Sequence, residues 1–143
     1  MVQSLSFPGP KEFYEQFKNN PEAAKKAAFQ VGQKMGQVLK QRSNIQGESL
    51  EAVAEILNAA MKSVHAELSV RVESNKVILS NSAFCAIMRA ALTLNIPWEW
   101  LDTNFAWPAI EGMASVISPD IKLTVSSARC RGDAACTHIL EIK

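Results

Sequence analysis

A change in the spacing of apolar residues near residue 68 limits the possible folds of this chain more than any other feature. Before it, apolar side chains recur every three or four residues over much of residues 21–66, which is the period of a helix. After it, "ELSVRVES" alternates Leu68, Val70 and Val72 with polar residues, which is the two-residue period of a half-buried strand. "SN" and "KVILSN" follow, so this segment predicts a hairpin. The chain therefore combines helices with antiparallel strands.

Two helices are expected in the first part of the chain, after an irregular segment at residues 1–10. "KEFYEQFKNN" predicts a short helix. A longer helix is expected from Pro21 to about Arg42, because Asn20 can cap it and proline suits the first helical position. The apolar stripe of this longer helix consists of Ala24, Ala28, Val31, Met35 and Val38.

A third helix is expected from Glu48 to about Ala66. Its inner face consists of Leu50, Val53, Leu57, Ala60, Met61 and Val64. His65 falls at its C-terminal end, where a protonated imidazole would interact favourably with the helix dipole. We expect this histidine to have a structural role rather than a catalytic one.

Gly32 and Gly36 lie one turn apart inside the long helix. A glycine in a helix interior costs about 1 kcal/mol relative to alanine, so such a pair needs a compensating contact. The pair predicts the close approach of another backbone. The alternative is a gap that admits a ligand.

The second half of the chain also passes from helices to strands. Ser80, Asn81 or Ser82 would cap a helix that ends near Asn95. "PAIEGMASVIS" predicts a last helix that starts at its proline. "IKLTVSSARC" and "ACTHILEIK" predict two strands joined by a Gly-Asp turn, "RGDA". We therefore predict one α+β domain, residues 1–143, in which N-terminal helices pack with an antiparallel sheet built from two hairpins.

The composition argues against several classes of partner. The formal charge is +1 and no block of Lys or Arg stands out, so a nucleic-acid-binding surface is not expected. No apolar stretch is long enough to cross a bilayer, and the N-terminus lacks the pattern of a secretory signal. Three cysteines are too few for a disulfide framework, so we expect a cytoplasmic protein.

Two of the three cysteines flank the last predicted turn. If the strands pair across it, Cys130 and Cys136 lie close, and His138 shares one face of its strand with Cys136. Cys85 could complete a zinc site with these three residues. Three interpretations stay open for the cysteines: buried small residues, zinc ligands, or a redox-active pair.

Aromatic and Met residues could form an apolar ligand pocket. Alternatively they form an ordinary core, and Trp98 and Trp100 an exposed partner-binding patch. Arg129 and Arg131 could hold an anionic group of a ligand, or lie solvated in the hairpin. The candidate lining residues are Phe29, Met35, Phe84, Met88, Trp98, Trp100, Phe105, Trp107 and Met113.

Catalysis is the weaker hypothesis. The chain has no glycine-rich phosphate loop that opens a helix, so no nucleotide cofactor is expected. It also lacks the Gly-x-Ser-x-Gly pattern of a nucleophile elbow. A binding function is therefore preferred over an enzymatic one.

A helical first half and a hairpin are followed by the cysteine-containing segment "SAFCAIMRAALTLNIP" and the closing segment "SSARCRGDAACTHILEI". The closing pattern consists of Cys130, Gly132–Asp133, Cys136 and Ile139–Leu140. In this layout the chain, from about residue 20, resembles the 4-vinyl reductase domain family, which is related to the small subunits of the TRAPP vesicle-tethering complex.

The resemblance implies a module that binds a hydrophobic small molecule. Relatives sense aromatic hydrocarbons, are linked to tetrapyrrole metabolism, or hold an acyl chain, and the phenol-type sensors bind zinc in this region. It also implies a homodimer, through the Gly32 and Gly36 face or the first helix, and a separate output protein. Alternatives are an enzyme or accessory protein of tetrapyrrole metabolism, and a redox- or zinc-dependent assembly protein.

Overall fold

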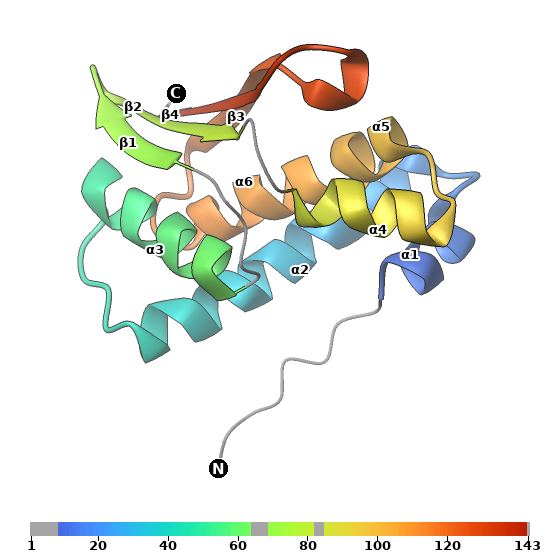
Figure 1. Ribbon diagram of the computed structural model, residues 1–143. Coiled ribbons are helices and arrows are strands. Elements are labelled where there is room, and N and C mark those ends of the chain that lie inside the picture. The colour runs from blue at the N-terminus through green and yellow to red at the C-terminus, as the bar shows by residue number, and fades with distance from the viewer. Residues whose placement is uncertain (1–8, 64–68, 82–84, 143) are drawn as a thin grey trace.

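The computed structural model describes residues 9–63, 69–81 and 85–142, and shows helices on one face of a four-stranded sheet (Figure 1). The first half contains α1 (Pro10–Phe17), α2 (Pro21–Arg42), α3 (Leu50–Ser63), β1 (Ser69–Glu73) and β2 (Lys76–Asn81). The second half contains α4 (Ala86–Leu94), α5 (Trp98–Leu101), η1 (Asp102–Ala106), α6 (Trp107–Ser115), β3 (Ile121–Ser127), η2 (Arg129–Arg131) and β4 (Cys136–Ile142). His65 and Phe84 lie outside the described residues.

The predicted helices of the first half are present. The side chain of Asn20 caps α2, because its Oδ1 accepts a hydrogen bond from the backbone N–H of Ala23 at 3.2 Å. The buried face of α2 differs from the predicted stripe in its second half, where Gly32, Gly36 and Leu39 are buried. Val31, Met35 and Val38 are only half-buried, because the glycines lie at the contact with α6.

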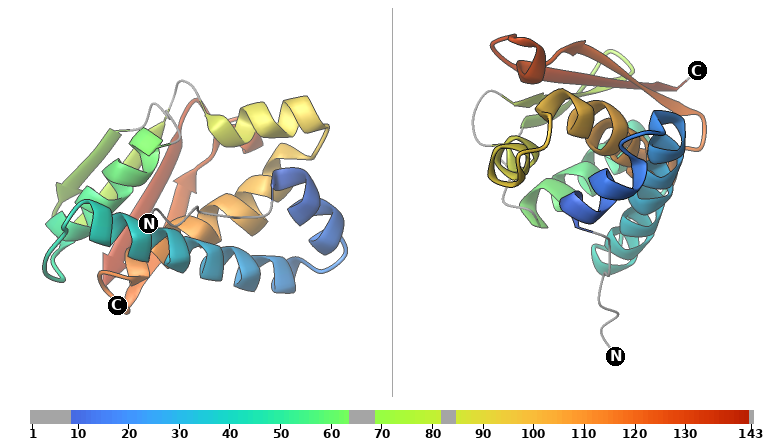
Figure 2. Two further views of the ribbon diagram at one scale, coloured as in Figure 1. Left: turned by 90° about the horizontal axis from the view of Figure 1, so that it is seen from below. Right: turned by 90° about the vertical axis from the view of Figure 1, so that its right-hand side faces the viewer.

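The two hairpins form one antiparallel sheet. The right-hand view of Figure 2 shows the helices against one side of this sheet. The strand order is β1-β2-β4-β3, so β2 and β4 join the hairpins at the centre. Val77 opposes Leu140, and Leu79 opposes His138. The predicted α+β fold, with its sheet of two hairpins, is confirmed.

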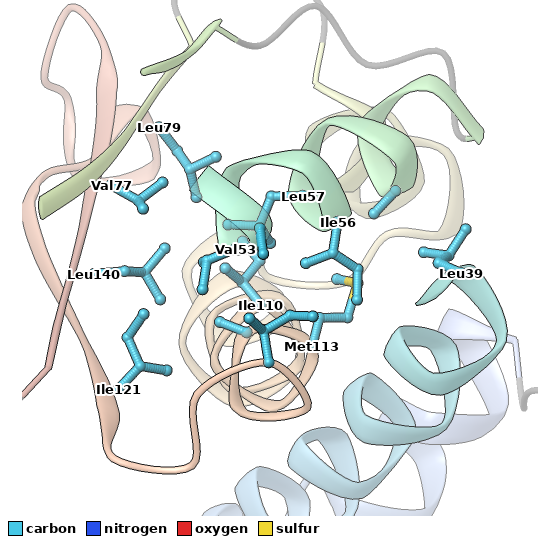
Figure 3. Close-up of a cluster of buried hydrophobic side chains, with 14 of the residues drawn as sticks. Leu39, Val53, Ile56, Leu57, Val77, Leu79, Ile110, Met113, Ile121 and Leu140 are labelled. Atoms are coloured by element: carbon cyan, nitrogen blue, oxygen red, sulfur yellow. The ribbon is translucent and has the colours of Figure 1, made fainter. Parts of the chain in front are cut away.

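The main core lies between the sheet and helices α3 and α6 (Figure 3). Buried and less buried residues alternate along β2 and β4. One face of each strand therefore points into the core, as expected for a two-residue period. The fully buried side chains of this cluster include Val53, Ile56, Leu57, Val77, Leu79, Ile121 and Leu140.

The start of α4 corrects the predicted cap. Asn81 belongs to β2, and the N-cap of α4 is Cys85, whose Sγ accepts a hydrogen bond from the backbone N–H of Met88 at 3.5 Å. The predicted end is confirmed, because Asn95 adopts the left-handed conformation typical of a C-cap.

The aromatic stretch before α6 is helical, which the sequence analysis did not predict. Helix α5 leads into the π-helical segment η1, and α6 begins at Trp107 rather than at Pro108. Pro108 is therefore inside the first turn of α6, where proline is tolerated.

The last turn is larger than the predicted "RGDA" turn. Strand β3 ends at Ser127, and Cys130 lies in the short 3-10 helix η2 instead of on a strand opposite Cys136. The ladder partner of Cys136 on β2 is Asn81. The turn closes where Asp133 Oδ2 accepts a hydrogen bond from the N–H of Ala128 at 2.9 Å.

Glycines allow α2 and α6 to touch backbone to backbone. A Cβ built on Gly32 would overlap the carbonyl oxygen of Ala109, and one built on Gly112 would overlap the carbonyl oxygen of Phe29. The close backbone approach predicted from Gly32 and Gly36 is thus confirmed. The same contact occupies the face that was predicted to form a dimer interface.

We expect Gly32→Ala and Gly112→Ala each to lower the free energy of unfolding by about 2–3 kcal/mol, because the helices must separate to admit a methyl group. Urea unfolding measures the change. Gln37→Ala, at an exposed position of α2, is the matched control and should stay within about 0.5 kcal/mol of the parent. Unchanged midpoints for both glycine variants would show that the crossing is looser than described.

Candidate functional site

A cavity of about 180 Å³ lies between the helices and the start of β4. Side chains from α2, α3, α4, η1, α6, β2 and β4 form its wall, which is apolar over most of its surface. The lining residues are Met35, Ala60, Met61, Asn81, Cys85, Ala86, Ile87, Asp102, Phe105, Ala106, Trp107, Ala109, Ile110, Met113, Cys136 and His138.

The π-helical segment η1 supplies one side of this wall. A π-turn spaces its hydrogen bonds five residues apart and is often found at functional sites. Here Asp102, Phe105 and Ala106 line the cavity. Asp102 is buried, which is rare for a carboxylate.

The surroundings of Asp102 hold its pKa unusually high. Burial raises the pKa of its carboxyl to about 6, against the lowering effects of the Cys130 thiol, the Arg131 guanidinium and the Trp98 indole. Among the described residues, neither Oδ2 of Asp102 nor Nε1 of Trp98 has a partner within hydrogen-bonding geometry. The nearby groups therefore stabilise the charge of this carboxylate only in part.

His138 is the second buried titratable group of the wall. Burial alone lowers its pKa to about 4, so the imidazole is neutral at physiological pH. Its ring lies edge-on to Trp107, with the ring centroids 6.3 Å apart. Within the described part of the chain, Nδ1 has no hydrogen-bond partner.

The zinc site predicted from Cys85, Cys130, Cys136 and His138 is not supported by the arrangement of the described residues. In residues 9–63, 69–81 and 85–142, no three His, Cys, Asp or Glu side chains are arranged to hold a metal ion. Burial raises the pKa of Cys136, and burial with the nearby Asp102 carboxylate raises the pKa of Cys130 to about 12. Both thiols are therefore harder to ionise than an ordinary cysteine. All three cysteines are free, and Cys85 and Cys136 line the cavity.

Trp107 also lines a second, wider groove. The groove has a volume of about 590 Å³ and lies against α2, α6 and β3, with both basic and acidic side chains at its edges. Arg131 lies over the Trp107 ring at 5.0 Å from its centroid and is 3.8 Å from a carboxylate oxygen of Glu99. Phe29 and Arg131 line this groove instead of the cavity.

The other predicted lining residues differ in their positions. Met35, Phe105, Trp107 and Met113 line the cavity. Trp98 and Trp100 are half-buried in aromatic and aliphatic clusters, where Trp100 packs edge-on to Tyr14 at 4.9 Å. Met88 does not line the cavity, and Arg129 donates a hydrogen bond to Asn81 and lies 5.9 Å from the Trp98 ring centroid.

Asp102 and Asn81 were missed by the sequence analysis. The signal for Asp102 was present, because it is a charged residue in the otherwise apolar run "WEWLDTNFAWP". Asn81 gave no such signal, since its position at the end of a strand is equally typical of a helix cap.

The fold resembles that of a solved trafficking protein. A structure of trafficking protein particle complex subunit 3 from Naegleria fowleri, covalently bound to palmitic acid, matches with a TM-score of 0.61. The two share a fold. Sequence identity is 12%, and the match covers 86% of this chain and 80% of the other.

The other two comparisons gave no match. No family model matches the chain, and no curated protein matches its sequence. The structural similarity supports the TRAPP part of the predicted resemblance, and nothing found supports the 4-vinyl reductase part. No helix in the described part of the chain is both long and apolar enough to span a membrane.

The pKa shifts of Asp102 and His138 predict opposite pH dependences of stability. His138 has a lowered pKa, so its contribution is present above about 6.5 and is lost as the pH falls toward 4. Asp102 has a raised pKa, so its contribution is present below 3.8 and is lost as the pH rises through about 6. The two effects, each about 3 kcal/mol, nearly cancel between pH 4 and 6.

Single substitutions should reveal each effect. Relative to the parent, Asp102→Asn should become less stable as the pH falls from 6.5 to 4, and His138→Phe as the pH rises from 4 to 6. Urea unfolding at half-unit pH intervals measures both profiles. Parallel profiles for the parent and both variants would contradict the assignment.

Proposed function

We propose that this chain is a non-catalytic binding module that holds a hydrophobic small molecule of the acyl-chain class in the cavity between the helices and β4. The observation that carries the proposal is a mostly apolar cavity within a fold shared with a protein covalently bound to palmitic acid. Ligand sites are mostly apolar, with a few polar groups that orient the guest. Asn81, Asp102 and His138 supply such polar groups here.

The cavity volume favours a slender guest. An engineered apolar cavity of about 150 Å³ binds benzene, and pockets for drug-sized ligands measure about 300–1,000 Å³. At about 180 Å³ this cavity suits a small ring or part of an acyl chain, and it is too small for a tetrapyrrole. A small aromatic hydrocarbon is therefore the second candidate guest.

Cys85 is the group best placed to hold an acyl chain covalently. It lines the cavity and is half-buried at the N-cap of α4, whereas Cys136 is 5% exposed and Cys130 does not line the cavity. Its thiol would attack the carbonyl carbon of an acyl thioester. The carbon–sulfur bond to the donor breaks, and the donor leaves as a thiol that carries the proton of Cys85.

Mass spectrometry under native and denaturing conditions tests the proposal. We expect the native mass to exceed the mass of the chain by that of a hydrophobic guest. A guest that survives denaturation should be lost from Cys85→Ser and retained by Cys130→Ser. Ala86→Phe places a ring in the cavity and should abolish binding, whereas Ala90→Phe on the same helix, which does not line the cavity, should preserve it.

Equal guest binding by Ala86→Phe and Ala90→Phe would place the guest elsewhere. A bare native mass, together with failure to bind added fatty acyl probes, would argue against a binding module altogether. Circular dichroism of each variant separates loss of binding from loss of fold.

We further propose that the chain associates with a second copy. The similar solved protein is a complex subunit by name, and Leu92 on α4 is 73% exposed, which is high for a large apolar side chain. In sedimentation, Leu92→Lys should shift the protein toward monomer, while Thr93→Lys, at a neighbouring exposed position, should not. A parent protein that is monomeric at all concentrations would contradict self-association.

A further inference from the structure

Two buried side chains of the cavity wall have polar atoms with no hydrogen-bond partner among the described residues. They are Asp102, through Oδ2, and His138, through Nδ1. Asp102 is 4% exposed and His138 is 6% exposed. Because native proteins pair nearly all buried polar atoms, with protein groups or with ordered water, such atoms on the wall of one cavity are positions where a guest can form hydrogen bonds.

Other polar atoms of the same wall already have partners. Oδ1 of Asn81 accepts a hydrogen bond from Nη1 of Arg129 at 3.3 Å. Sγ of Cys136 accepts one from the backbone N–H of Arg129 at 3.3 Å, and Sγ of Cys85 accepts one from Met88. The capacity for a new hydrogen bond is therefore concentrated at Asp102 and His138.

We propose that Asp102 selects the polar group of the guest: it favours an aliphatic chain that carries a hydroxyl or an amine and excludes one that carries a free carboxylate. This inference rests on the proposed function, because it takes the cavity as the binding site. It adds a chemical class to the guest and a specificity-determining residue to the site.

The chemistry of a carboxylate gives the direction of this preference. An ionised carboxylate only accepts hydrogen bonds, so it needs a donor on the guest. A second carboxylate nearby would be repelled, because charges interact strongly inside an apolar enclosure. Arg131 offsets this repulsion only in part, since it lies over the Trp107 ring and lines the wider groove, and the pKa of Asp102 stays raised to about 6 despite its charge.

His138 does not reverse the preference. A neutral imidazole presents one donor and one acceptor nitrogen, so Nδ1 can pair with a hydroxyl in either tautomer. Burial keeps this ring neutral, and it therefore offers no positive charge to a carboxylate. An acyl group held as a thioester also has no free carboxylate, so covalent attachment is compatible with the same wall.

Binding of three probes of one chain length tests the inference. Decan-1-ol, decanoate and methyl decanoate are compared by calorimetry at pH 7.5, where Asp102 is ionised. We expect the alcohol to bind at least tenfold more tightly than decanoate, with the ester between them. In Asp102→Asn the amide can also donate, so the ratio of alcohol to decanoate affinity should fall at least tenfold.

Two controls separate the possible failures. Asp120→Asn makes the same chemical change at an exposed position and should leave the ratio unchanged. Equal affinities for all three probes, abolished by Ala86→Phe, would overturn the preference and keep the cavity as the site. No binding by the parent protein, or binding unaffected by Ala86→Phe, would overturn the proposed function as well. The ranking in the parent protein is itself decisive, so the inference is testable even if Asp102→Asn does not fold.

Discussion

The backbone contact between α2 and α6 is the constraint on which the remaining structure depends. Gly32 and Gly112 bring each helix within reach of the other's carbonyl oxygens, and no other residue type fits at either position without moving a helix. Because α6 continues directly from η1, this crossing also sets the position of the π-turn. The cavity wall that contains Asp102 and Trp107 is therefore positioned by the backbone contact between α2 and α6 at their glycines.

Much of the fold could be predicted from the period of apolar residues. The strands of both hairpins, the long helix with its Asn20 cap, and the Asn95 end of α4 all follow from local patterns. Each depends on interactions within a few residues of the chain, which a sequence displays directly. The pairing of β2 with β4, which joins the hairpins, is a long-range contact that these patterns left open.

The errors concentrate where tertiary contacts override local preference. The segment from Trp98 to Trp107 contains aromatic residues and lies between prolines, yet α5 and η1 are helical because their side chains pack into two clusters. Cys130 was expected on a strand, but a 3-10 turn removes it from the ladder. An apolar ligand cavity was predicted, together with some of the residues that line it. The buried position of Asp102 was not predicted, because it lies in a π-helical segment that no sequence pattern indicated.

Trp107 lines both the apolar cavity and the wider groove with charged side chains at its edges. The indole contacts the neutral His138 ring and also lies beneath the Arg131 guanidinium, so the two surroundings of this side chain differ sharply in polarity. A molecule bound in either space would therefore change the surroundings of the same indole, so the two spaces are linked through one side chain.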